Sequence, residues 1–228
     1  MRRIGLGLAA LCVMAGSAAA QEPPMTERTE KLSLKPHRVK GLLLGYGYTV
    51  GEFTGEVRTR AKSTRAIVLN ADNAKSNYTI SKAGWANPVQ VSCAGGESRL
   101  SFAWIEFKRQ DLSYVCGFQG GPADATFALA LSEGSLMSRL YQPQRAAELT
   151  YNGVTVRAHT RKVDGAMPIG SGRTMSYVIT HDGREIGGLV RGVMQPTFYL
   201  PPAGSPDREA AAIMVLSLYF FADPADAD

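Results

Sequence analysis

The chain has 228 residues, 45% of them hydrophobic, and its 25 Lys and Arg against 20 Asp and Glu give a net charge of +5. The hydrophobic content excludes a disordered chain. So small and dispersed a positive charge argues against a nucleic-acid-binding protein, in which basic residues are concentrated in clusters. The length fits one domain, because β-barrels and β-sandwiches often reach this size as single units.

The first 20 residues have the order of a secretory signal peptide. Arg2 and Arg3 form a cationic start, residues 4–14 are apolar, and residues 15–20 are small and end in three alanines. Export signals have this order, so we expect cleavage after Ala20 and a mature protein in an oxidising compartment, the bacterial periplasm. The alternatives are secretion from the cell and, without cleavage, a buried N-terminal helix. Loss of two arginines leaves 23 basic against 20 acidic residues, a net charge of +3. The apolar run is shorter than the about 20 residues of a membrane span.

Removal of the signal leaves two of the three cysteines, Cys93 and Cys116. In an exported chain two cysteines most simply form a disulfide, and the alternative is a pair of buried free thiols. If residues 88–93, 99–107 and 112–118 are consecutive strands of a meander, the first and third lie about 10 Å apart. A disulfide needs Cα atoms within about 7 Å, so we expect Cys93 in the loop that follows the first strand.

The rest of the chain divides into a tether and a β domain. Residues 21–40 are polar and carry three prolines, which predicts a flexible tether. A single β domain is expected over 41–228. Its clearest strands are 53–62 and 151–161, in which side chains alternate between two faces. Further strands are expected at 66–69, 78–81, 89–92, 99–107, 112–118, 126–131, 135–140, 175–180, 185–191 and 197–200.

Two dipeptides predict tight hairpin turns between these strands. Asn152-Gly153 and Asp182-Gly183 each lie between two alternating runs, and such pairs favour type I′ turns. Strands that recur at short intervals with turn signals between them indicate an all-β sandwich or barrel.

The last segment does not fit a sheet. Ser205 can cap a helix and Pro206 suits its first position, and the following residues to 222 are almost entirely apolar. A helix over 206–222 without a polar face must be buried on all sides. We therefore expect a buried core helix; a membrane anchor and a buried strand are the alternatives. A closed barrel with the helix along its axis accommodates it, and a simple sandwich does not.

Three C-terminal features carry a resemblance to a known family. They are the hairpin of residues 177–187, the strand Thr197–Leu200, and the apolar helix that ends in Phe220-Phe221-Ala222. With them the C-terminal portion resembles the group of tubby, LURP-one and phospholipid-scramblase proteins, in which a barrel encloses a hydrophobic C-terminal helix. The resemblance implies a mainly β fold, an antiparallel barrel of about ten to twelve strands with the C-terminal helix buried inside. We carry over only the fold from this resemblance and assign no functional residue by it.

Catalytic motifs are missing from the sequence. Ser171 lies between two glycines but not in a Gly-x-Ser-x-Gly elbow, and His181-Asp182 lies in a tight turn that explains both residues. Residues 45–48 lack the helix and Lys of a phosphate loop, which favours a strand. We expect no cofactor, and two cysteines with three scattered histidines offer too few ligands for a metal. An enzyme would need a pocket that gathers His159 or His181 with a carboxylate.

Two predicted strands each project three basic side chains from one face, namely Arg58, Arg60 and Lys62 on the first and Arg157, His159 and Arg161 on the second. If the strands are neighbours, the side chains form a cationic ladder suited to anionic lipid headgroups or envelope polymers. The alternative is an ordinary solvated face, because like charges directly opposite each other destabilise a sheet.

Three classes of function follow. The first, which we favour, is a non-catalytic periplasmic envelope protein that binds or scaffolds an envelope component. The second is a carrier or sensor of a lipid or apolar ligand held in a barrel cavity, and the third is a hydrolase whose site is not visible in the sequence. We expect no nucleic-acid partner and no integral membrane protein after cleavage. The position of helix 206–222 separates the first class from the second, since a filled barrel leaves no cavity.

Overall fold

The computed structural model describes residues 22–40, 45–58, 75–96, 113–131, 145–163, 176–191 and 195–221. The predicted signal peptide and the predicted strands at 66–69, 99–107 and 135–140 lie outside these described residues.

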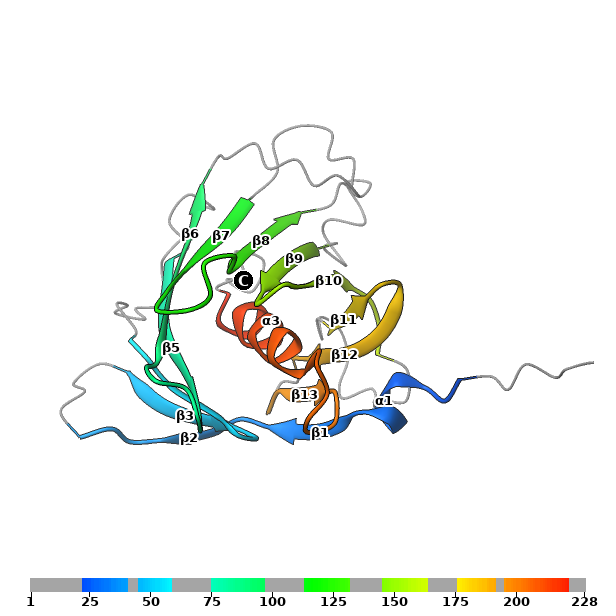
Figure 1. Ribbon diagram of the computed structural model, residues 1–228, viewed down its shortest axis with the longest axis horizontal. Helices are drawn as coiled ribbons and strands as arrows, with labels where there is room; N and C mark the ends of the chain where they lie inside the picture. The colour runs from blue at the N-terminus through cyan, green and yellow to red at the C-terminus, as the bar shows by residue number, and fades with distance from the viewer. Residues whose placement is uncertain are drawn as a thin grey trace, which may run out of the picture.

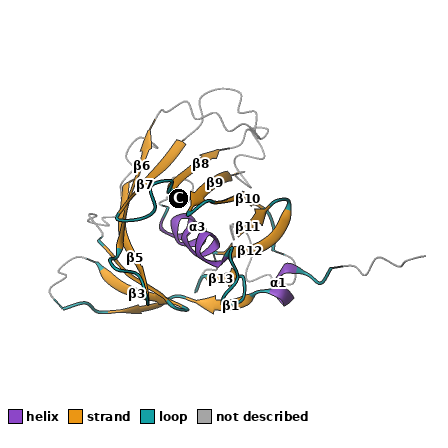
Figure 2. Ribbon diagram, viewed as in Figure 1, coloured by secondary structure: helices purple, strands orange, loops and turns teal. Residues whose placement is uncertain are grey.

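Thirteen strands form one antiparallel sheet that curls into a nearly closed barrel (Figures 1 and 2). The sheet order is β1-β13-β12-β11-β10-β9-β8-β7-β6-β5-β4-β3-β2. The strands are β1 (Glu30–Ser33), β2 (Lys35–His37), β3 (Tyr46–Val50), β4 (Phe53–Val57), β5 (Lys75–Lys82), β6 (Val89–Gly96), β7 (Ser113–Gln119), β8 (Thr126–Leu131), β9 (Arg145–Tyr151), β10 (Val154–Thr160), β11 (Ser176–His181), β12 (Arg184–Val190) and β13 (Thr197–Leu200). The prediction of a mainly β, antiparallel barrel with a C-terminal helix is confirmed, with thirteen strands where about ten to twelve were expected.

The segment expected to be a flexible tether instead closes the barrel. Helix α1 (Met25–Arg28) precedes β1, and Leu34 alone separates β1 from β2. Because β1 pairs with β13 and β2 pairs with β3, this segment joins the two edges of the sheet. Met25 packs in a small cluster on the outer face of β11 to β13. Strand pairing and burial therefore order residues that their polar composition assigned to a tether.

The C-terminal helix α3 (Arg208–Phe220) lies inside the ring of strands (Figure 1). Ten of its 13 residues are buried, and its backbone lies nearest to β9, β10, β12 and β13. The prediction of a buried helix is confirmed, with ends two residues inside the predicted 206–222. Among the described residues, no helix has both the length and the apolar character needed to span a bilayer.

Aromatic rings connect the C-terminal end of α3 to the opposite wall of the barrel. The ring of Phe220 lies 4.7 Å from that of Tyr78 on β5 and 5.0 Å from that of Tyr48 on β3, and the ring of Phe221 lies 4.7 Å from that of Tyr114 on β7. Pairs of this kind contribute about 0.5–1.5 kcal/mol each beyond the burial of their area. The Tyr78 hydroxyl also bonds to Ser217 Oγ at 2.8 Å, so the one polar side chain buried in the middle of α3 has a partner on the wall.

The two predicted hairpin turns are confirmed. Asn152 and Gly153 have φ angles of 52° and 77°, and Asp182 and Gly183 have φ angles of 49° and 78°. Type I′ turns need positive φ at both central residues. Since the sheet is antiparallel throughout, these turns lie at the same end of the barrel as the start of α3.

Candidate functional site

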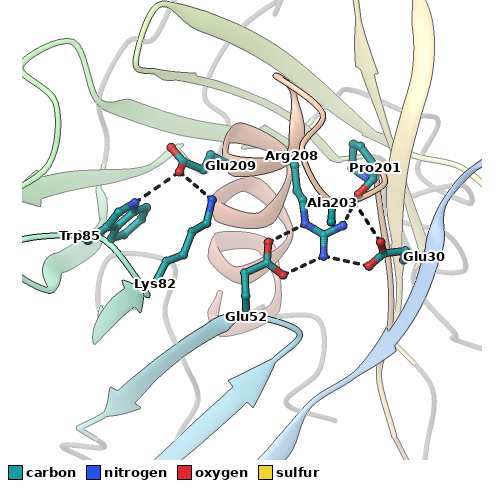
Figure 3. Close-up of polar contacts among 8 residues, drawn as sticks. All are labelled: Glu30, Glu52, Lys82, Trp85, Pro201, Ala203, Arg208 and Glu209. Atoms are coloured by element: carbon teal, nitrogen blue, oxygen red, sulfur yellow. Dashed lines mark hydrogen bonds and ion pairs between the residues drawn. The ribbon is translucent and has the colours of Figure 1, made fainter.

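Charged side chains gather around the buried Arg208 where α3 begins (Figure 3). The Arg208 guanidinium donates to both carboxylate oxygens of Glu52, at 2.6 and 2.7 Å, and to Glu30 Oε2 at 2.9 Å. It also donates to the carbonyl oxygen of Pro201. Only 5% of the Arg208 side chain is exposed. Because Glu30 belongs to β1 and Glu52 to the turn after β3, one arginine of the helix holds both sides of the place where the barrel closes.

The next helical residue makes a second set of contacts. Glu209 Oε1 accepts from Lys82 Nζ at 3.0 Å and from Trp85 Nε1 at 3.3 Å. The Trp85 ring in turn stacks on Tyr151, with centroids 6.3 Å apart. We call Glu30, Glu52, Lys82, Trp85, Arg208 and Glu209 the anchoring cluster, since they connect the first turn of α3 to β1, β5 and two connecting turns.

Two carboxylates of the anchoring cluster, those of Glu30 and Glu52, are held ionised. A hydrogen bond from the Ala203 N–H, and then one from Arg208, lower the pKa of Glu30. The hydrogen bond from Arg208 lowers the pKa of Glu52, and that to Glu52 raises the pKa of Arg208. The two partly exposed carboxylates therefore neutralise the charge of the buried Arg208. Among the described residues, no group of three or more His, Cys, Asp or Glu could hold a metal ion.

His181 meets a carboxylate, as the enzyme hypothesis required. Its Nδ1 lies 2.8 Å from Asp207 Oδ1, and its Nε2 lies 3.6 Å from Asp182 Oδ2. A histidine that activates a nucleophile needs one ring nitrogen facing a hydroxyl or thiol. Here both nitrogens face carboxylates, and Asp207 is the residue that precedes α3. The pair thus ties the β11–β12 hairpin to the start of the helix.

The first predicted basic trio is only partly described. Arg58 is exposed directly after β4, and Arg60 and Lys62 lie outside the described residues. Strands β5 to β9 separate β4 from β10 in the sheet. Arg58 is therefore not on a neighbour of β10, and the adjacency of strands that the cationic ladder required is absent for β4 and β10.

The second trio lies on the outer face of β10 and just after it, beside acidic partners. Arg157 Nε lies 3.0 Å from Glu148 Oε2, and Arg161 pairs with Glu185. Burial, and then the charge of Arg161, lower the pKa of His159. This part of the surface therefore carries charges of both signs.

The predicted disulfide between Cys93 and Cys116 is present. The two residues lie directly opposite each other on β6 and β7, with Cα atoms 4.0 Å apart. The expectation that Cys93 lies in a loop is wrong, because β6 continues to Gly96 and pairs directly with β7.

Two hollows of the described residues lie on the outer surface. One, of about 680 Å³, is open and lies between residues 22–28 and the tip of the β11–β12 hairpin at 183–185. The other, of about 80 Å³, lies between β10 and β11. Neither is lined by the anchoring cluster.

Sequence reasoning missed the anchoring cluster, although one signal pointed to it. Arg208 is a cation in the first turn of a helix, where the macrodipole disfavours positive charge. Such a residue needs an anionic partner, but Glu30 and Glu52 lie more than 150 positions earlier in the chain.

Comparison of the chain with protein-family models, curated proteins and solved structures found no match. The resemblance to the tubby, LURP-one and scramblase group therefore stays a prediction, and the function is argued from the residues of this chain.

Proposed function

We propose that this protein is a non-catalytic envelope protein of the periplasm that binds or scaffolds an envelope component. The observation that carries the proposal is the position of α3. Ten of its 13 residues are buried, and aromatic rings of β3, β5 and β7 pack on its C-terminal end. This favours a protein that acts through its outer surface over one that holds a lipid within the barrel.

Two further features support the proposal. The disulfide fits an oxidising compartment, where such bonds form and persist. The polar side chains that could have served catalysis are bonded to one another, since Arg208 holds Glu52 and Asp207 holds His181. A barrel that its own helix occupies is suited to present a fixed surface to a partner.

Native mass spectrometry of the protein purified from its own envelope tests this proposal. We expect the mature chain, starting after Ala20, together with a stoichiometric envelope component and without a retained lipid. A lipid or apolar ligand bound one-to-one to the isolated chain would contradict the proposal and favour the carrier. Hydrolysis of ester, amide or glycoside probes by the purified protein would favour the hydrolase instead.

A narrower version of the proposal names the partner as an anionic lipid or an anionic envelope polymer. Arg58, directly after β4, and Arg157 on β10 are exposed, though β4 and β10 are far apart in the sheet. Binding to vesicles of anionic lipid, compared between the natural protein and an Arg58→Glu, Arg157→Glu variant, tests this version. We expect the variant to lose binding, and an absence of binding by the natural protein would remove anionic lipid as the partner.

A further inference from the structure

Four exposed cations follow one another on the segment that closes the barrel. Residues 31–40 run through β1, β2 and the start of the connection to β3, and they contain Lys31, Lys35, Arg38 and Lys40 but no Asp or Glu. All four of these residues are exposed. Figure 1 shows β1 and β2 end to end along one side of the barrel. We call the four residues the basic row.

The basic row carries most of the net positive charge of the chain. Outside it remain 21 of the 25 Lys and Arg against 20 Asp and Glu, so the rest of the chain is almost neutral. Composition alone does not reveal this concentration, because it sums the charges over the whole sequence. A local excess of one sign raises the concentration of oppositely charged partners nearby.

The cations of the basic row have no acidic partner, whereas cations elsewhere on the barrel do. Each of five other basic residues pairs with a glutamate, namely Arg28, Lys82, Arg157, Arg161 and Arg208. Within the part of the chain that the structure describes, no member of the basic row has an ion pair or a side-chain hydrogen bond. Since protein surfaces ordinarily intersperse charges of both signs, a row of one sign indicates an anionic partner outside the chain.

The acidic side chains around the basic row lie outside it. Glu30, directly before the row, turns toward the start of α3, where it accepts from Arg208 and from the Ala203 N–H. Glu27 belongs to α1, and Glu56 belongs to β4 on the far side of β3. No acidic residue therefore interrupts the positive charge along residues 31–40.

Packing on the inner and outer faces of the sheet fixes the course of the basic row. Leu32 and Leu34 pack against the core, so the alternation of a strand directs Lys31 and Lys35 outward. A Cβ added at Gly47 would clash with the side chains of His37 and Val39, which therefore lie against the outer face of β3. A surface fixed before binding loses little conformational entropy on association.

We infer that the basic row binds an extended anionic polymer of the envelope, one whose chain carries phosphate or carboxylate groups. The inference rests on the proposed function, in which an envelope component is the partner. From Lys31 to Arg38 the row spans about 23 Å at 3.3 Å per residue, so several charged groups of one extended chain can lie along it.

The shape of the basic row favours a polymer chain over the broad anionic surface of a bilayer. The row lies between two strands, β13 and β3, whose outward side chains carry no charge. These side chains are Thr197 and Tyr199 beside β1, and Gly47 and Thr49 beside β2. A single line of cations between uncharged strands matches an extended chain, whereas a bilayer would meet the uncharged strands as well.

The residue types also favour a polymer over one small anion. Three of the four cations are lysines, and a lysine ammonium is a compact, hydrated point charge that imposes no fixed bonding geometry. A small anion would need a pocket, but the two hollows described above lie beside residues 183–185 and between β10 and β11. The row is therefore suited to recognise a high density of negative charge along a chain.

Titration of labelled polyphosphate and labelled polyglutamate with the purified protein, followed by fluorescence anisotropy, tests this inference. Counterion release lowers the logarithm of the association constant by about 0.7 per cation for each tenfold increase in salt. We therefore expect a slope of about −3 for the four cations of the natural protein. The polymer that binds more tightly identifies the anionic group, and a failure to bind either polymer overturns the inference.

Lys31→Gln combined with Lys35→Gln tests the residues themselves. This variant should bind about tenfold or more weakly at low salt, with a slope of about −1.5, because two fewer counterions are released. The matched control is Lys162→Gln combined with Arg184→Gln, which removes two exposed cations outside the row. Circular dichroism confirms that both variants are folded. An equal loss of affinity in the two variants overturns the inference.

Two other results would assign the basic row a different role. Binding to vesicles that contain phosphatidylglycerol, without binding to either polymer, would make a bilayer the partner and overturn the inference. Lysine and proline also protect exposed strand edges from pairing with other chains. If the Lys31, Lys35 variant self-associates in sedimentation yet binds the polymers as tightly as the natural protein, the lysines serve that protection instead.

Native mass spectrometry separates a failure of this inference from a failure of the proposed function. If the Lys31, Lys35 variant retains the envelope component that the natural protein carries, the basic row is not its site. The inference is then wrong while the proposed function stands. If the natural protein carries no envelope component, the proposed function is contradicted, whatever the polymers bind.

Discussion

Replacement of Arg208 by methionine tests how the helix is held in the barrel. The substitution keeps most of the side-chain volume but leaves Glu30 and Glu52 without their shared cation and the Pro201 carbonyl without its donor. Removal of one partner from a buried ion pair costs about 3–5 kcal/mol. Since the Glu30 and Glu52 side chains are 40% and 30% exposed, water solvates them partly, and we expect a loss of about 2–3 kcal/mol.

Urea denaturation at neutral pH, followed by far-UV circular dichroism, measures this loss as a lower midpoint at unchanged slope. Arg157→Met is the matched control, because it removes an arginine from a more exposed ion pair. The Arg157 side chain is 47% exposed and that of its partner Glu148 is 28% exposed. Such a surface pair contributes about 0–1 kcal/mol. If Arg208→Met lowers the free energy of unfolding no more than Arg157→Met does, the anchoring role of the cluster is refuted.

Three further results are expected. Tyr78→Phe should lower the free energy of unfolding by about 1–2 kcal/mol, because it leaves the buried Ser217 hydroxyl without its partner on the barrel wall. Adding Ser217→Ala should restore part of this loss. If the effects of the two substitutions simply add, the contact is contradicted. Alanine at both Cys93 and Cys116 should cost about 3 kcal/mol of unfolding free energy in the chain-entropy model, and reduction of the natural protein should add the mass of two hydrogen atoms. The pKa of Glu52 is lowered in the folded state, so the stability that its ionised form contributes is complete above pH 4.5 and is lost as the pH falls through the folded-state pKa. Glu52→Gln should therefore make the free energy of unfolding depend less steeply on pH in the acid range. An unchanged slope would contradict this role of Glu52.

The features of the fold that were predictable are those with strong local patterns. The Asp182-Gly183 turn follows from the backbone conformations that hairpins need, and the burial of α3 follows from a sequence without a polar face. Strand β9 was not predicted, because Ala146, Ala147 and Glu148 favour a helix over a strand. Its first three residues are buried in succession, so the alternation that marks a half-exposed strand is absent.

The features that were not predictable depend on partners distant in the sequence. Glu30 meets Arg208 only because β1 pairs with β13, next to the start of the helix. The position of Cys93 was predicted wrongly because the strand order near residue 99 was assumed and not determined by any local signal. Whether Arg58 and Arg157 lie near each other was likewise not predictable. Periodicity assigns a side chain to one face of a strand but does not tell which strands are neighbours in the sheet.

The most direct test of the account is hydrogen exchange of the α3 amides in the purified protein without lipid or detergent. If α3 fills the barrel, the amides of residues 211–220 exchange only through global unfolding and are among the most protected of the chain. Rapid exchange of these amides, or protection that appears only when lipid or detergent is added, would contradict the filled barrel and the non-catalytic function proposed from it.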